Sequence, residues 1–237
     1  MKSFISIIAC ALGGFLLSPP SLAQGPPTNS AEADFAQLSH YREANLQMSL
    51  SGTKIKVVFL GDSVTERWGS LSGKWFADPG WVNRGIGGQT SSQLLLRERD
   101  DALNLHPSAI VLEAGSNDMR LGFTPEAIRD HFLTMGELAQ AHHIAIFVTT
   151  MTPTCDCFRP LSGLRTVSRI HDLNRLLAAM CLERHWTLID INTPLANASG
   201  YMRKELTVEG VHPNDAGYAL IAPPIERALH AYRLKKP

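Results

Sequence analysis

Residues 55–63 read IKVVFLGDS, an apolar run that ends in a glycine, a carboxylate and a hydroxyl. The run from Ile55 to Leu60 is rich in β-branched and aromatic side chains, which predicts a strand buried within a parallel sheet. Helices cover both faces of such sheets, and ligands bind beyond the carboxyl ends of the strands. We therefore expect Asp62 and Ser63 to lie at the ligand-binding edge of the sheet.

Four other segments resemble this run and predict the rest of the sheet, at residues 109–114, 144–149 and 187–191 and, more briefly, at 81–83. Between the strands, apolar residues recur at helical spacing. The predicted helices cover residues 91–105, 125–141, 167–184 and 215–234. Alternating strands and helices form a parallel sheet with helices on both faces. The sequence therefore predicts an α/β fold, a three-layer sandwich around a five-stranded parallel sheet.

The composition indicates one globular domain without a preference for polyanions. The chain has 237 residues, of which 44% are hydrophobic and 19% charged, which suits a single domain with a substantial core. Lysine and arginine together number 22, and aspartate and glutamate also number 22. Because these charges cancel, no overall field attracts the protein to nucleic acid or to an anionic membrane.

The first 23 residues have the pattern of a secretory signal peptide. Lys2 supplies a positive charge, residues 4–17 are apolar, and Ser21-Leu22-Ala23 ends in a small residue at a cleavage position. Cleavage removes only Lys2 from the charge count, which leaves 21 positive and 22 negative side chains, or −1. An uncleaved membrane anchor is the alternative, and no later apolar run predicts a membrane span.

We accordingly predict three parts of the chain. Residues 1–23 form the signal peptide, residues 24–50 a leader and flanking segment, and residues 51–237 a single domain. The predicted location is secreted or periplasmic.

Export would place three cysteines, Cys155, Cys157 and Cys181, in an oxidising compartment. A bridge between Cys155 and Cys157 needs a bent backbone, so a bridge from either of them to Cys181 is at least as plausible. The sequence leaves this pairing open. A zinc site is a weaker alternative, because Cys-x-Cys lacks a matching second pair.

Two more polar segments follow predicted strands. Residues 85–90 read GIGGQT, and residues 115–118 read GSND. Taken singly, these residue types are also typical of tight turns and helix caps. Near the C-terminus, residues 209–213 read EGVHP, with Glu209 three residues before His212. A serine hydroxyl needs a nearby base and a third group to orient that base, and His212 and Glu209 have the residue types for these roles.

Together, the four segments resemble the SGNH-hydrolase superfamily, also called GDSL esterases and lipases, over about residues 50–230. The segment around residues 83–90 is similar to secreted bacterial acylhydrolases and to the platelet-activating-factor acetylhydrolase branch. The resemblance implies a flavodoxin-like fold with Ser63 as nucleophile and His212 as base. It also implies an oxyanion hole of Ser63, Gly88 and Asn117, and no metal or organic cofactor.

One residue departs from the family pattern, which usually has aspartate three residues before the histidine. Glu209 keeps the carboxylate and adds a methylene, and glutamate is the third member in other serine hydrolases. In the alternative, Glu209 points to solvent and a backbone carbonyl orients His212. Asp190, at the end of a predicted strand, is a competing acid that is more typical of a turn.

The resemblance implies a carboxylic ester hydrolase for short acyl groups, with a small molecule or a carbohydrate ester as substrate. A lysophospholipase or thioesterase is the alternative on the same machinery, and a non-catalytic carbohydrate-binding protein is the alternative of another class. An α/β-hydrolase is disfavoured because the chain lacks a Gly-x-Ser-x-Gly pentapeptide. Trp68, Trp75 and Trp81 either belong to the core or stack on the substrate.

Overall fold

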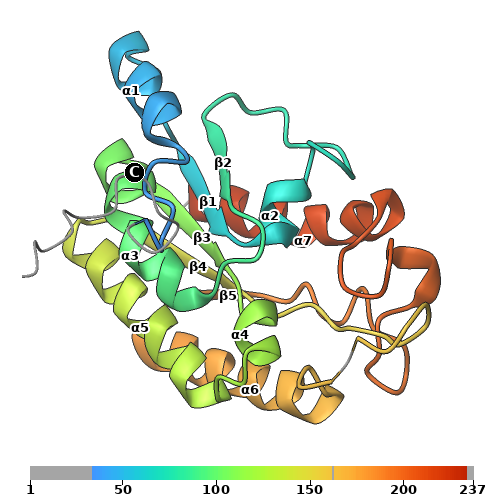
Figure 1. Ribbon diagram of the computed structural model, residues 1–237. Coiled ribbons are helices and arrows are strands. Elements are labelled where there is room, and N and C mark those ends of the chain that lie inside the picture. The colour runs from blue at the N-terminus through green and yellow to red at the C-terminus, as the bar shows by residue number, and fades with distance from the viewer. Residues whose placement is uncertain (1–33, 162, 234–237) are drawn as a thin grey trace, which may run out of the picture.

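The computed structural model describes residues 34–161 and 163–233 (Figure 1). The predicted signal peptide and residues 24–33 of the predicted leader lie outside the described residues. Five parallel strands form the sheet in the order β2-β1-β3-β4-β5, which confirms the predicted fold class. They are β1 (Val57–Gly61), β2 (Trp81–Gly85), β3 (Ala109–Glu113), β4 (Ala145–Thr149) and β5 (Thr187–Ile189).

The central position of β1 brings three polar segments together. Gly61 at the end of β1 pairs in register with Gly85 of β2 on one side and with Glu113 of β3 on the other. The segments that begin at Asp62, Ile86 and Ala114 therefore leave the sheet at one edge. This register is why residues far apart in the sequence share a site.

Helices cover both faces of the sheet (Figure 1). One face packs against α3 (Ser91–Asp101), α5 (Pro125–Ala141) and α6 (Val167–Arg184), and the other against α7 (Asp215–Arg233). Alternate residues of β1 point to opposite faces, so that Val58 and Leu60 join the first core while Val57 and Phe59 join the second. All four side chains are buried, as expected for a strand covered on both sides.

The long helices begin and end at recognisable capping residues. The Thr124 side chain accepts a hydrogen bond from Ala127 N at the start of α5, and Pro125 occupies its first turn. The Thr166 side chain accepts from Arg169 N in the same way at the start of α6. The predicted helix 91–105 is wrong at its end, because Ala102 has φ −135° and ψ −60° and separates α3 from the short 3-10 helix η1 (Leu103–Leu105). A second 3-10 helix, η2 (Lys204–Leu206), precedes the C-terminal loop.

Three short helices were absent from the sequence-based prediction. They are α1 (Arg42–Ser51), α2 (Ser63–Arg67) and α4 (Ser116–Arg120). The helices α2 and α4 have five residues each, which is too few for an apolar repeat to be recognised, and α1 has no buried residue. None of the helices in the described residues is long and apolar enough to cross a membrane.

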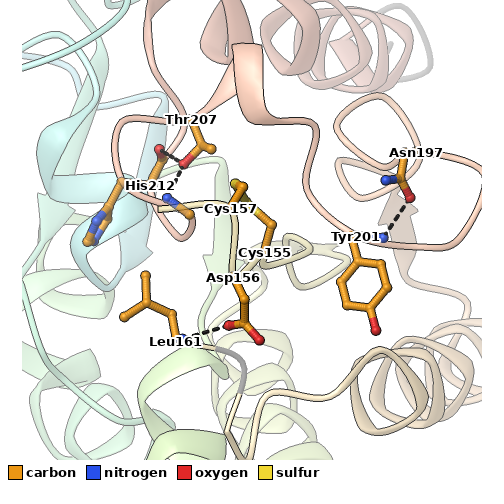
Figure 2. The surroundings of a disulfide bond; sticks show 9 residues. Cys155, Asp156, Cys157, Leu161, Asn197, Tyr201, Thr207 and His212 are labelled. Atoms are coloured by element: carbon orange, nitrogen blue, oxygen red, sulfur yellow. Dashed lines mark hydrogen bonds between the residues drawn. A yellow bond between two sulfur atoms is a disulfide. The ribbon is translucent and has the colours of Figure 1, made fainter. Parts of the chain in front are cut away.

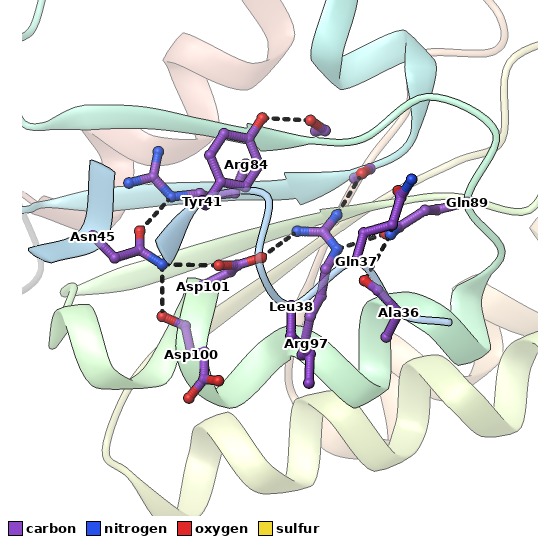
Figure 3. Close-up of polar contacts among 12 residues, drawn as sticks. Ala36, Gln37, Leu38, Tyr41, Asn45, Arg84, Gln89, Arg97, Asp100 and Asp101 are labelled. Carbon is purple, nitrogen blue, oxygen red and sulfur yellow. Dashed lines mark hydrogen bonds and ion pairs between the residues drawn. The ribbon is translucent and has the colours of Figure 1, made fainter. Parts of the chain in front are cut away.

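The segment before residue 51 packs against the sheet domain. The Tyr41 hydroxyl donates to Gly85 O at the end of β2, and the Tyr41 ring lies against the Arg84 guanidinium, 4.6 Å from ring centroid to Cζ. The Asn45 amide donates to Asp101 of α3 (Figure 3). Residues from Asp34 onward therefore extend the folded unit beyond the predicted domain start.

Trp68, Trp75 and Trp81 belong to the core on the α7 side. Trp68 and Trp81 are buried, and the Trp68 ring centroid lies 4.9 Å from that of Phe76 and 5.0 Å from that of Tyr218. Trp75 packs edge-on against Phe59, with 5.0 Å between centroids. Of the two interpretations of these side chains, the core one is the one that the packing supports.

Candidate active site

Ser63 begins the short helix α2 directly after β1. The Asp62 side chain caps this helix, because its Oδ1 accepts a hydrogen bond from Val64 N at 2.9 Å. The Tyr218 hydroxyl of α7 donates to Val64 O at 2.7 Å. A Cβ on Gly85 would lie 2.1 Å from Glu66 N, so a glycine at the end of β2 is what lets α2 fold back against the sheet. The serine is thus fixed by β1, β2 and α7 together.

His212 lies beside Ser63 and is held by Glu209. The distance from His212 Nε2 to Ser63 Oγ is 2.8 Å, and His212 Nδ1 hydrogen-bonds Glu209 Oε1. Asp190 lies elsewhere, since its Oδ1 accepts from Asn192 N at 2.9 Å and from Thr193 N at 3.0 Å in the turn after β5. Glu209 is therefore the carboxylate that the structure brings to the histidine.

A tight turn holds this carboxylate and the histidine in place (Figure 2). The Thr207 hydroxyl donates to His212 O at 2.8 Å and accepts from Gly210 N at 2.9 Å. Val208 N also donates to His212 O, at 2.9 Å. The turn is then tied to the loop after β4 by a hydrogen bond from Cys155 N to Gly210 O at 2.9 Å.

The environment of His212 favours the neutral imidazole. Burial lowers the pKa of His212 below its ordinary value of 6.5, and the Glu209 carboxylate opposes this effect only in part. The side chain of His212 is 17% exposed and that of Glu209 is 28% exposed. The second carboxylate oxygen of Glu209, Oε2, is buried and has no hydrogen-bond partner among the described residues.

Three candidate hydrogen-bond donors belong to segments that meet beside Ser63. Among the described residues, no acceptor is bonded to the backbone N–H of Ser63 or of Gly88. The Asn117 amide donates to Gln89 O at 3.0 Å and to Asp62 Oδ2 at 3.3 Å. Gln89 adjoins Gly88 and Asp62 adjoins Ser63 in the chain. Asn117 therefore lies close to both of the other donors. Gly88 has φ +80°, and a Cβ there would meet nothing within 4 Å, so its surroundings are open.

Two buried carboxyl groups lie beneath the nucleophile. Asp62 and Glu113 share a hydrogen bond, and Glu113 Oε2 also accepts from the Thr65 hydroxyl at 3.0 Å. Burial raises the pKa of both, and that of Asp62 well above its ordinary value, because the nearby Glu113 adds its negative charge. Their surroundings therefore favour the neutral form of each carboxyl group.

A second Ser-His-Asp contact occurs beside the site. Ser91 Oγ donates to Asp118 and lies 2.8 Å from His131 Nδ1, and Ser91 N bonds both oxygens of Asp118 at 3.0 Å. Ser91 is fully buried. A hydroxyl that no substrate can reach is no candidate nucleophile, so this cluster anchors the start of α3 to α4.

Arg97, which was not among the predicted site residues, connects the loop after β2 to the end of β1 (Figure 3). The fully buried Arg97 donates to Gly61 O at 2.9 Å, to Gln89 Oε1 at 2.6 Å and to Asp101 at 3.0 Å. The Gln89 side-chain amide in turn donates to Ala36 O at 2.9 Å. The i,i+4 spacing of Arg97 and Asp101 within a predicted helix is the signal in the sequence for this pair.

Cys155 and Cys157 form a disulfide next to the His212 turn (Figure 2). Cys181 is buried and free. The structure thus chooses the Cys155–Cys157 bridge among the pairings that the sequence left open. Burial raises the pKa of the Cys181 thiol to about 12, which makes it unreactive while the protein is folded. In the described part of the chain, no three His, Cys, Asp or Glu side chains are grouped so as to hold a metal ion.

Comparison with solved structures identifies close relatives of this fold. A candidate acylhydrolase of Bacteroides fragilis superposes with a TM-score of 0.76 and 30% identity, covering 84% of this chain and 98% of its own. A GDSL-like lipase of Bacteroides thetaiotaomicron gives a TM-score of 0.75 and 28% identity, covering 84% of this chain and 100% of its own. No curated protein matches the sequence significantly.

The model of one protein family matches residues 59–220, more than half of the chain. Its description is the GDSL-like lipase/acylhydrolase family, in agreement with the family that the sequence motifs resemble. The family prediction is thus confirmed by sequence and by structure. The chain belongs to the GDSL-like lipase/acylhydrolase family and is an enzyme that hydrolyses esters.

Proposed function

We propose that this protein is a serine esterase that uses Ser63, His212 and Glu209 to hydrolyse esters of short carboxylic acids. The observation that carries the proposal is the continuous chain of hydrogen bonds from Ser63 Oγ through both ring nitrogens of His212 to Glu209. It lies beside two backbone N–H groups that have no acceptor in the described residues. A nucleophile, a base, an orienting acid and oxyanion donors are what acyl transfer requires.

In the proposed reaction, His212 Nε2 takes the proton of Ser63 Oγ while that oxygen attacks the ester carbonyl carbon. His212 Nδ1–H donates to Glu209, which holds the imidazole in the required tautomer and stabilises its protonated form. His212 then gives its proton to the departing alcohol, and an acyl-serine remains. A water molecule, deprotonated by the same nitrogen, releases the acid and restores Ser63.

The negative charge of the intermediate develops on the former carbonyl oxygen. We assign the N–H groups of Ser63 and Gly88 and the side-chain amide of Asn117 as its donors. The hydrogen bond from Asn117 to Asp62 is long, at 3.3 Å, so this amide hydrogen has the least to lose when it turns to the substrate. Removal of one such donor typically costs about a hundredfold to a thousandfold in kcat.

The raised pKa values of Asp62 and Glu113 serve the same step. Two charged carboxylates near the donors would oppose a new negative charge in a poorly solvated site. Because burial favours their neutral forms, the two groups stand beside the site at a lower electrostatic cost to the oxyanion.

Two features support the substrate class and the location. Structures with the same fold include an acetyl-xylooligosaccharide esterase from Geobacillus, at 17% identity, and an acetyl xylan esterase, at 23%. These identities establish only the shared fold, and they make acetylated carbohydrates substrates to test. The Cys155–Cys157 disulfide fits an oxidising compartment, which supports our proposal that residues 1–23 direct secretion or periplasmic export.

Hydrolysis of p-nitrophenyl esters from acetate to palmitate tests this function. Purified protein is compared with Ser63→Ala and with Ser91→Ala, which removes the buried hydroxyl beside His131. We expect a rate that is highest for acetate to butyrate, lost in Ser63→Ala and retained in Ser91→Ala. A rate that is highest for palmitate would favour a lipase. A folded protein without activity on any ester would contradict the esterase proposal and favour a carbohydrate-binding protein.

A further inference from the structure

The geometry points to a substrate that carries a negative charge, a carboxylate or a phosphate, close to the ester group, and assigns Arg67, Arg120 and Arg165 to its recognition. This inference rests on the proposed function and deepens it, because it names a property of the ester that the Ser63 site hydrolyses. Three placements carry it, one for each arginine.

Arg67 shares a helix face with the nucleophile. It follows Ser63 by four residues within α2, a spacing that places two side chains next to each other on a helix. Arg67 is half-buried. Among the described residues, no side-chain hydrogen bond or ion pair involves its guanidinium, whereas its backbone carbonyl accepts from the loop that follows α2.

Arg120 and Arg165 flank the proposed oxyanion donor Asn117. Arg120 is exposed and follows Asn117 by three residues within α4, which again places the two side chains on one face. Arg165 comes from the loop after β4, and its Nε donates to Ser116 O at 2.8 Å, directly before Asn117. Its Nη1 donates to Leu161 O at 3.4 Å.

The three positive charges act on one another and on the site. The charges of Arg67 and Arg165 lower the pKa of His212, and the charge of Arg120 lowers that of Arg165. The placement of the arginines agrees with this. Arg67 and Arg120 lie about one helical turn from Ser63 and Asn117, and Arg165 donates to Ser116 O. Because the Asn117 amide reaches Asp62, next to Ser63, the three arginines come from segments that meet at the site.

The acids in this space form no ion pair with the arginines. Burial lowers the pKa of Arg165, and the charges of Asp62 and Glu209 oppose this effect. Glu209 is hydrogen-bonded to His212, and burial raises the pKa of Asp62, which favours its neutral form. The carboxylate of Glu66 lies against Gly87, since a Cβ there would be 2.6 Å from Glu66 Oε2. Glu66 is also about 100° around the helix axis from Arg67.

Consistent with this, the ion pairs of the described residues include none of the three arginines. Positive charges gathered without ion-pair partners repel one another, at a cost to the fold. An anionic ligand relieves that repulsion, and a guanidinium matches carboxylate and phosphate geometry through paired donors.

Matched esters test the inference. One pair places the charge on the alcohol, as 4-acetoxybenzoate against its methyl ester. The other places it on the acyl group, as mono-p-nitrophenyl succinate against p-nitrophenyl methyl succinate. We expect kcat/KM to be about tenfold higher for the anionic member of at least one pair, and that preference to shrink with added salt. The pair that shows the preference identifies the side of the ester that carries the charge, and a free acetyl phosphate assay separates phosphate from carboxylate recognition.

Arginine variants locate the effect. Arg67→Gln and Arg120→Gln should each reduce the ratio of kcat/KM for the anionic ester to that for the neutral ester about threefold to tenfold. Arg165→Lys keeps the charge and replaces the donor to Ser116 O without emptying a buried position. Arg227→Gln is the matched control, because Arg227 is exposed and lies near the far end of α7, and it should leave both rates unchanged.

Three results would contradict the inference. Equal rates for both members of both pairs would overturn it while leaving the esterase function intact. The preference for the anionic ester could also survive in Arg67→Gln and Arg120→Gln, or fall equally in Arg227→Gln. Either result would show that Arg67, Arg120 and Arg165 are not its cause. A folded protein that hydrolyses no ester at all would remove the proposed function and the inference together.

Discussion

His212 Nε2 lies 2.8 Å from Ser63 Oγ although 149 residues separate the two in the chain. The contact depends on two independent anchors. Ser63 is fixed by the turn from β1 into α2, and His212 by a loop that Thr207 closes and that Cys155 N ties to the end of β4. Because the two anchors come from different parts of the fold, either can be altered by mutation without changing the other.

Glu209 should be required for catalysis and dispensable for folding. Glu209→Gln keeps the size of the side chain and removes its charge, so His212 loses the stabilisation of its protonated form. We expect kcat on p-nitrophenyl acetate to fall about a thousandfold to ten-thousandfold, as when the triad acid of a serine protease becomes an amide. The thermal midpoint should change little, because the side chain is 28% exposed.

Glu209→Asp is the informative companion to that variant. It restores the residue that the family usually has at this position, with a carboxylate one methylene shorter. Activity well above that of Glu209→Gln would show that charge is the main requirement. Activity as low as that of Glu209→Gln would show that the length of the side chain is the main requirement. Wild-type activity in Glu209→Gln would show that Glu209 has no part in the mechanism.

The pH dependence of kcat/KM should follow the lowered pKa of His212. The base must be neutral to accept the proton of Ser63, and burial favours the neutral form. Activity should therefore stay constant from neutral pH down past 6.5, the ordinary value for histidine, and fall only at lower pH. A pH-rate profile on a neutral ester measures this, and an acid limb centred above pH 6.5 would contradict it.

The Arg97–Asp101 pair should be a major contributor to stability. Both side chains are 1% exposed or less, and Arg97→Met would leave Asp101 buried with one donor, the Asn45 amide. Breaking a buried pair from one side costs about 3 to 5 kcal/mol. Urea unfolding measures this loss, and kcat should fall as well, because Arg97 holds Gly61 and Gln89.

The control for Arg97 is Arg129→Met. Arg129 pairs with Asp130 at the surface, with side-chain exposures of 32% and 61%, and such pairs contribute about 0 to 1 kcal/mol. Equal losses of stability in the two variants would contradict the role given to the buried pair.

The cysteines should differ in reactivity. Cys155 and Cys157 are bonded and Cys181 is buried, so the folded protein lacking residues 1–23 should react slowly with a thiol reagent, and the unfolded, unreduced protein should show one thiol. Titration with Ellman's reagent in and out of guanidinium measures both numbers. Three thiols in the unfolded protein would contradict the bridge.

The long elements of the fold could be predicted because each has its own local signal. The helices α5 and α6 begin at threonine caps and repeat apolar residues over several turns, and their predicted bounds match the structure. The strand β2 could be predicted only in part, because Asn83 and Arg84 interrupt its apolar run. Both are held by tertiary contacts, Asn83 to Thr65 O and Arg84 to Asn45.

The site divides in the same way. Ser63, Gly88 and Asn117 follow predicted strands, so their proximity could be expected from the parallel sheet. Glu209 and His212 follow no strand, and their place beside Ser63 could be expected from their residue types and spacing and from the family resemblance. Arg97, Glu113 and Arg165 do not belong to a recognisable motif in the sequence. Glu113 looks like the end of an apolar strand, and its role depends on Asp62, 51 residues earlier, lying against it. Pairings of this kind arise from the register of β1 with β3, which composition and periodicity do not specify.

The most direct test of the central claim is the mass of the intact protein after reaction with a fluorophosphonate, followed by peptide mapping. We expect one adduct per chain, on Ser63, absent in Ser63→Ala and His212→Ala and present in Ser91→Ala. An adduct on any other serine, or a folded and unlabelled wild-type protein, would contradict the assignment of Ser63 as the nucleophile.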